Sequence, residues 1–184
     1  QMSSGLAKEL GYSPLRHILN TGGIVRFPEA QFDMVRLGLG LYGIDTTGQV
    51  QDKLQNVSTL KTTISQIKII PPNVSVGYDR KWKSDQETRI ATVGIGYADG
   101  YDRRLSNGIG FMLVRNRKAP VVGNICMDMC MIDISKIPEA EEGDEVIVFG
   151  NELPVYKIAK KAGTISYEIL TGVSSRVKRV YYQE

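Results

Sequence analysis

Cysteine and histidine are scarce in this sequence, and their scarcity argues against a metal centre. The 184 residues include two cysteines and one histidine. Cys126 and Cys130 form a C-x3-C pair without a second pair, and His17 lies far from both, so we expect no metal site. Reduced thiols are typical of a cytoplasmic protein, and the cytoplasm is the location that we predict.

Long apolar runs and an excess of one charge are missing as well. The chain has no run of about 18 apolar residues, so we expect no membrane-spanning segment. The 23 basic and 20 acidic residues leave a net charge of +3, and the basic residues are interleaved with apolar ones, so nucleic acid is not an expected partner. Hydrophobic residues make up 42% of the chain, which is enough for a folded core.

An initiator methionine at position 1 and a targeting pattern are also missing. The sequence opens on SSGLAKELGYSP (3–14), which has the character of the end of a helix. We therefore expect a fragment of a longer protein.

Residues 1–45 alternate short strands with helical pieces. RHILN (16–20) and MVRLGLGLYG (34–43) have the character of strands, and GGIVRFPEAQF (22–32) between them is helical. This rhythm is typical of parallel sheets and barrels.

Residues 46–184 have a different pattern, with apolar or alternating runs between turn signals, and this pattern predicts an antiparallel β-domain. The expected strands are residues 58–70, 89–98, 111–116, 119–127, 130–134 and 144–150, with RNRK as a tight hairpin connection. A helix should begin at Pro154 and stop at Gly163. A second helix, with Ser166 as its N-cap, and a final strand RVKRVYY (176–182) should follow.

Two glycine-containing segments suggest a site for an anion. Asn20 and Thr21 precede Gly22 and Gly23 where a helix should start, and unpaired backbone N–H groups at such a position attract a phosphate. Gly38, in the next segment, would let the backbone approach a bound group. A phosphorylated cofactor fits this pattern, although the glycines could equally serve tight packing.

Three side chains remain ambiguous from the pattern alone. Arg36 stands between apolar residues of an expected strand, where a buried guanidinium needs either a structural carboxylate or a ligand. His17 is by itself more typical of a structural residue. Tyr97, in GYADGYDRR, lies at a strand end that presents its side chain out of the sheet. A phenol needs nearby cations to act as a base near neutral pH, so packing is the simpler role.

Taken together, these segments resemble the alanine racemase family, which depends on pyridoxal 5'-phosphate (PLP). The resemblance extends from about residue 10 to residue 182 and rests on HILNTGG, MVRLGLGLYGI, GYADGYDRR, APVVGNICMDM and TISYEILTGVSSRVKRVY. It implies an N-terminal (β/α)8 barrel that holds PLP on a lysine, followed by a mainly β C-terminal domain. Residues 1–45 would be the last part of the barrel, and residues 46–184 the C-terminal domain.

The resemblance also implies a homodimer with a composite active site, in which the barrel of one subunit receives the C-terminal domain of the other. The function implied is the interconversion of L-alanine and D-alanine for peptidoglycan synthesis. The PLP-binding lysine should lie upstream of Gln1, so the isolated chain is expected to be inactive.

Roles for individual residues follow from the resemblance. Tyr97 matches the base that removes the α-proton of the L-substrate, and Arg36 the arginine at the pyridine nitrogen. Met127 matches the position whose backbone N–H holds the substrate carboxylate, and Asp128 should line the entrance. The remaining cofactor neighbourhood comprises His17, Asn20, Thr21, Gly38, Leu39 and Tyr167.

The sequence departs from the family pattern at Asp79, where glycine is usual, and at Met129. These departures leave a serine or broad-specificity racemase as an alternative. A non-catalytic β-module for dimerisation or ligand binding is a third possibility.

Overall fold

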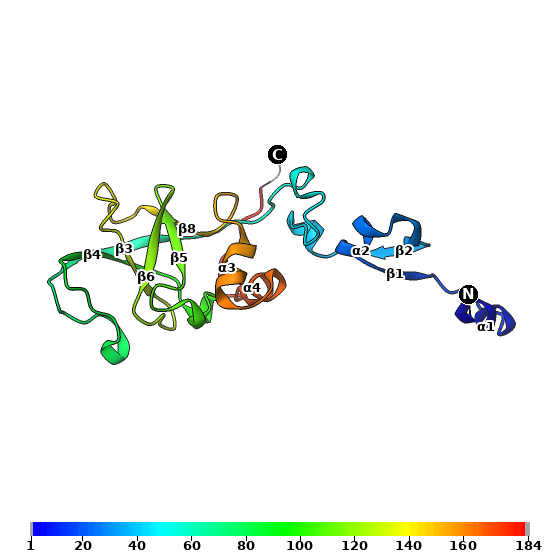
Figure 1. Ribbon diagram of the computed structural model, residues 1–184, viewed down its shortest axis with the longest axis horizontal. Helices are drawn as coiled ribbons and strands as arrows, with labels where there is room; N and C mark the ends of the chain where they lie inside the picture. Colours follow the sequence, from blue (N-terminus) through cyan, green and yellow to red (C-terminus); the bar gives the residue numbers. More distant parts are fainter. Residues whose placement is uncertain (1, 183–184) are drawn as a thin grey trace. The chain divides into compact units, whose positions relative to one another are not determined.

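A computed structural model describes residues 2–182, and the chain divides into two compact units (Figure 1). The first unit ends at Val57 and the second begins at Ser58. The domain boundary that the sequence predicts between residues 45 and 46 stays a prediction.

The first unit contains a strand, a helix and a parallel strand, as its sequence predicts. Strand β1 (His17–Asn20) is followed by α2 (Thr21–Arg26) and then by β2 (Met34–Arg36), which pairs with β1. Helix α1 (Met2–Glu9) precedes them. The second strand is shorter than expected, because the backbone turns at Gly38 into a 3-10 helix, Leu39–Tyr42.

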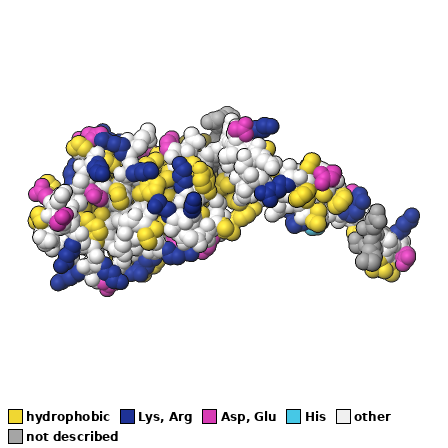
Figure 2. All heavy atoms as spheres, in the orientation of Figure 1, with side chains coloured by type: hydrophobic (Ala, Val, Ile, Leu, Met, Phe, Trp, Pro, Cys, Tyr) yellow, Lys and Arg dark blue, Asp and Glu magenta, His cyan; other side chains and the backbone are white. Residues whose placement is uncertain are grey.

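Apolar side chains gather on the surface of this first unit, over the segments that Figure 1 labels β1, α2 and β2 (Figure 2). A strand pair with a single short helix is too small to bury both of its faces. The exposed apolar residues of this unit include Ile18, Phe27, Phe32, Met34, Leu37 and Leu41.

The second unit is a closed antiparallel barrel, which confirms the predicted fold class. The order around the barrel is β3 (Leu60–Ile70), β4 (Thr88–Val93), β7 (Cys130–Asp133), β6 (Arg117–Val122), β5 (Phe111–Val114) and β8 (Glu145–Phe149). Strand β3 closes the barrel because residues 60–63 pair with β8 and residues 64–70 pair with β4.

The barrel encloses an aliphatic core. Fully burying a side chain of this kind contributes about 1.5–3 kcal/mol. Core residues from the strands include Ile64, Ala91, Val93, Met112, Val114, Val121, Ile132, Val146 and Val148.

The turns of the barrel follow their local chemistry. Between β5 and β6, Arg115 and Asn116 have φ values of 48° and 61°, and Val114 pairs with Arg117. Two consecutive positive φ values form the tight hairpin turn predicted from RNRK. Strands β4 and β6 end earlier than expected, at Val93 and Val122, and their final residues form turns instead.

Two helices follow the barrel. Helix α3 (Val155–Ala162) begins after Pro154 and ends at Gly163, whose φ is 69°, as predicted. Helix α4 (Ser166–Gly172) begins one residue earlier than predicted. Ile165 occupies the N-cap position, and Ser166 is buried in the first turn. The Thr164 hydroxyl instead contacts the Glu168 carboxylate.

The final strand predicted over residues 176–182 is wrong. The Arg179 guanidinium donates hydrogen bonds to the carbonyl oxygens of Val173, Ser174 and Val177, so this segment folds on itself and forms no strand. None of the helices within residues 2–182 has the length and apolar character needed to cross a membrane.

Candidate active site

Strands β1 and β2 place His17 and Arg36 side by side. The Nη1 of Arg36 lies 2.8 Å from the Nδ1 of His17. Because a guanidinium can only donate, Nδ1 must accept, and the hydrogen of a neutral imidazole then sits on Nε2. The guanidinium is exposed, so the expectation of a buried arginine is wrong. Its partner is an imidazole and not a carboxylate.

The loop after β2 is tied to the loop after β1 by one hydroxyl. Thr21 Oγ1 accepts hydrogen bonds from the backbone N–H groups of Gly38 (2.9 Å) and Gly40 (3.2 Å). Two accepted bonds leave the single hydrogen of the hydroxyl to donate to another acceptor. Asn20 caps helix α2 by accepting from Gly23 N–H (3.0 Å), and Leu39 is buried beside these residues.

In the second unit, the GYADG turn (residues 96–100) follows strand β4. Tyr97 begins a 3-10 helix, Tyr97–Asp99, and the residue is 44% exposed. Its backbone N–H donates to Cys126 O (3.0 Å), and the next N–H donates to Met127 O (2.9 Å). The contact is close, because a Cβ on Gly96 would lie 2.3 Å from Cys126 O.

Met127 is therefore held beside the Tyr97 backbone, and the residue is 56% exposed. Within the described part of the chain, no protein acceptor is bound to the Met127 N–H. A backbone N–H without a protein acceptor can bind a carboxylate. Asp128, the next residue, is also exposed.

Tyr101, the other tyrosine of GYADGYDRR, is buried, and only 2% of the residue is exposed. Its hydroxyl has no hydrogen-bond partner among the described residues. Burial, with a smaller contribution from Cys130, raises the pKa of Tyr101 far above its ordinary value. Tyr101 therefore serves packing, and only Tyr97 of this pair can meet a ligand.

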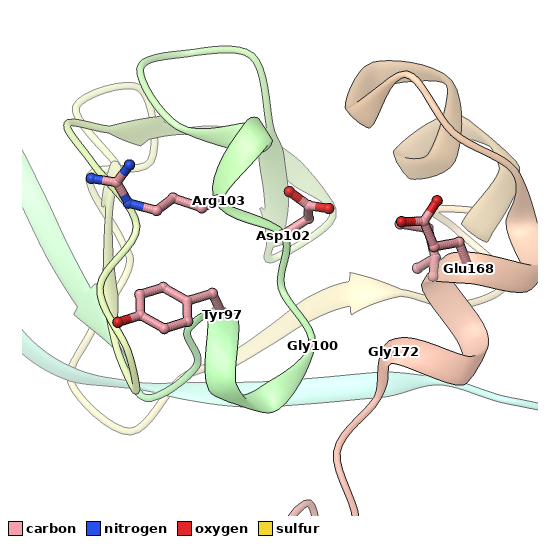
Figure 3. A pocket seen from close by; sticks show the side chains of 7 residues that line it. Tyr97, Gly100, Asp102, Arg103, Glu168 and Gly172 are labelled. Atoms are coloured by element: carbon pink, nitrogen blue, oxygen red, sulfur yellow. The ribbon is translucent and has the colours of Figure 1, made fainter.

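An open cleft of about 410 Å³ lies beside Tyr97, and Figure 3 shows it from close by. The Asp102 and Glu168 carboxylates point toward one another. Arg104 Nη2 binds both, at 2.5 Å from Asp102 Oδ2 and 3.1 Å from Glu168 Oε1. Arg103 has no carboxylate partner among the described residues, so it is the available cation of the cleft. The lining residues are Tyr97, Gly100, Asp102, Arg103, Glu168, Ile169 and Gly172.

A second exposed phenol, Tyr78, was missed by sequence reasoning. The residue is 71% exposed and lies on a loop whose ends are joined by a backbone bridge between Val76 and Trp82. Asp79 and Arg80, the next two residues, have φ values of 63° and 49°. Non-glycine residues in this left-handed region cost free energy, and such strain is concentrated at functional sites. The sequence feature that could have drawn attention to this loop is Asp79, which stands where the family pattern has glycine.

Asn124 holds the Tyr78 loop against the barrel. Its buried side-chain amide donates to Tyr78 O (3.3 Å) and to Asp79 Oδ2 (3.2 Å), and its oxygen accepts from Asn107 (3.1 Å). Because Asn124 is only two residues before Cys126, Tyr78 and Tyr97 are both attached to the segment that carries Met127.

The cysteines are free thiols. Burial raises the pKa of Cys130 to about 12 and also raises the pKa of the half-buried Cys126. Within residues 2–182, no three side chains of histidine, cysteine, aspartate or glutamate come together as a metal site.

Tyr167 lies on the first turn of helix α4, in the second unit. The structure thus brings together His17 with Arg36 and Thr21 with Gly38 in the first unit, and Tyr97 with Met127 in the second. The roles assigned to these residues stay predictions.

Comparison with known proteins identifies relatives of both units. The family model described as "Alanine racemase, C-terminal domain" matches residues 57–181, and "Alanine racemase, N-terminal domain" matches residues 1–46. The chain is 44% identical to an alanine racemase from Desulfovibrio desulfuricans over 172 residues, which are 92% of this chain and 46% of that protein.

Solved structures are similar as well. An alanine racemase from Streptomyces coelicolor has a TM-score of 0.92 at 35% identity, covering 100% of this chain and 50% of its own. One from Bartonella henselae, with covalently bound pyridoxal phosphate, has a TM-score of 0.87 at 33% identity, covering 97% of this chain and 50% of its own. The chain spans about half the length of the curated relatives that it matches.

Proposed function

This chain belongs to the alanine racemase family, and from that membership we propose that it forms part of a PLP-dependent enzyme that interconverts L-alanine and D-alanine. The observation that carries the proposal is the attachment of the exposed Tyr97 turn to Met127, within the segment matched by the family's C-terminal domain. In this proposal, residues 1–45 belong to the family's barrel domain and residues 46–184 form its C-terminal domain.

The residues of the first unit fit the cofactor. Thr21 has a hydroxyl hydrogen to donate to a phosphate oxygen, and the Gly38 and Asn20 loops lie beside it. Arg36 can donate to the pyridine nitrogen, and its contact with His17 orients the guanidinium. When bound, PLP supplies the electron withdrawal that weakens the Cα–H bond of the amino acid.

Proton transfer at Cα requires an acceptor on one face and a donor on the other. In the second unit, Tyr97 and Tyr78 are exposed phenols attached to the Met127 segment. Tyr97 is the proton acceptor proposed from the sequence. Tyr78 is the second candidate, because its phenol is exposed and Asn124 binds its loop to the same segment.

The substrate carboxylate would be held by the Met127 N–H. Arg103, the available cation of the cleft, would attract it by charge. Alanine is the substrate that family membership favours, and serine is the second candidate because of the departures at Asp79 and Met129. A homodimer with a composite site, a cytoplasmic location and a role in peptidoglycan synthesis complete the proposal.

Kinetics of the family-length protein that carries this chain test the proposal. With PLP, we expect it to convert L-alanine to D-alanine, and we expect the 184 residues alone to show no turnover. Matched Tyr78→Phe and Tyr97→Phe variants then identify the proton acceptor, which should lose at least about a hundredfold in kcat. The other variant should change KM more than kcat. Full activity in both variants would contradict a phenolic proton acceptor, and turnover by the 184 residues alone would contradict the domain assignment.

A further inference from the structure

Asp99, the third residue of the Tyr97 helix, connects the GYADG turn to the C-terminal segment. Its Oδ2 accepts from Gly96 N–H (2.9 Å), which closes the turn. Its Oδ1 accepts from Arg176 Nε (2.7 Å), and its backbone oxygen accepts from Ser174 N–H (3.1 Å). One residue therefore binds both its own turn and a segment more than seventy positions away.

A backbone contact reinforces this connection. Gly100 has a φ of 107°, and a Cβ at that position would lie 2.4 Å from Gly172 O and 2.8 Å from Val173 Cα. The turn thus packs directly on the end of helix α4. The same helix carries Tyr167 in its first turn, so α4 links the Tyr97 turn to a residue proposed for the cofactor neighbourhood.

The two partners differ in their access to water. The Asp99 side chain is 12% exposed, whereas the Arg176 side chain is 49% exposed. Removing the guanidinium would leave a nearly buried carboxylate without its cation, and a buried charge without a partner is strongly unfavourable. Asp99 would then have to move toward water, and that movement disturbs its bond to Gly96 N–H.

We infer that Asp99 and Arg176 are positioning residues, which hold the Tyr97 turn in a fixed place relative to helix α4. The spacing between Tyr97 and Tyr167 then depends on this ion pair. The inference rests on the proposed function, because substrate and cofactor binding are what make that spacing matter.

The chain offers a matched control for a purely structural role. Arg115 Nε binds Asp144 Oδ2 at 2.8 Å, and the exposed fractions of the two side chains, 43% and 20%, are close to those of Arg176 and Asp99. Arg115 lies in the hairpin turn between β5 and β6, and its guanidinium donates to the Asp144 carboxylate. Arg115→Gln therefore removes a similar ion pair without touching the candidate site.

The experiment compares Arg176→Gln, Arg176→Lys and Arg115→Gln in the family-length holoenzyme. Amide hydrogen exchange is measured over residues 96–99, together with kcat, KM and the melting temperature. We expect Arg176→Gln to speed exchange of these amides about tenfold and to lower kcat about tenfold, because small displacements of reacting groups are costly. Arg176→Lys, which keeps the charge, should recover part of both losses. Arg115→Gln should change neither.

Unchanged exchange over residues 96–99 in Arg176→Gln would overturn the inference. Faster exchange with the same kcat as Arg115→Gln would also overturn it, because the pair would then be merely structural. If the wild-type protein does not racemise alanine, the proposed function fails, and the exchange measurement alone still decides whether the pair holds the turn.

Discussion

At the scale of single residues, the two tyrosines of GYADGYDRR separate into a packed side chain and an exposed one. The sequence predicts that the Tyr97 side chain points out of the sheet, but no local pattern predicts that Tyr101 is buried. The difference comes from tertiary packing: Gly110 leaves room for the Tyr101 ring, whose hydroxyl would lie only 2.7 Å from a Cβ at that position.

The unpartnered Tyr101 hydroxyl leads to a prediction about stability. Tyr101→Phe removes a buried polar group that has no hydrogen bond, so the free energy of unfolding should stay equal or rise by about 1 kcal/mol. Chemical denaturation measures the change, with the exposed Tyr97→Phe as the control. A loss of more than about 1 kcal/mol would mean that the hydroxyl has a partner in solution.

The cysteines lead to a prediction about pH. Because the folded-state pKa of Cys130 is about 12, against an ordinary value of 9.0, its burial as a neutral thiol stabilises the protein fully below pH 9. This contribution is lost as the pH rises from 9 toward 12.

In the folded protein at pH 8, iodoacetamide should modify Cys126 slowly and Cys130 only after unfolding, as peptide mass spectrometry would show. Rapid labelling of Cys130 under these conditions would disprove its burial.

At the scale of elements, the barrel strands, the hairpin turn and helix α3 could be predicted, because the sequence features that specify them are local. Alternating apolar residues marked the strands, and Pro154 and Gly163 marked the ends of α3. A strand was wrongly predicted over residues 176–182, where the Arg179 guanidinium instead donates hydrogen bonds to the carbonyl oxygens of Val173 and Ser174, just before this segment. The strand order around the barrel and the Tyr78 loop depend on distant partners such as Asn124, which no local pattern reveals.

The contact between the GYADG turn and the Met127 segment leads to a prediction about packing. Gly96→Ala would place a methyl group 2.3 Å from Cys126 O, so we expect a loss of about 1–3 kcal/mol of stability. Gly94→Ala is the control, since the nearest atom to its Cβ is Thr62 Oγ1 at 3.8 Å. Thermal unfolding of the two variants provides the comparison, and equal stability would show that the two segments are not packed as described.

At the scale of the whole molecule, the two units place different chemistry on different folds. The parallel unit carries donors suited to a phosphate and a pyridine nitrogen, at Thr21 and Arg36. The barrel carries exposed phenols and a backbone N–H suited to a carboxylate. In the proposed function, racemisation needs both sets of groups. The chain matches about half the length of each of its relatives.

The most direct test of this account is racemisation by the family-length holoenzyme in heavy water. With L-alanine as substrate, we predict that optical activity decays to zero while deuterium enters at Cα, because the proton removed on one face is replaced by one from solvent on the other. L-alanine that keeps both its optical activity and its α-hydrogen would contradict the account.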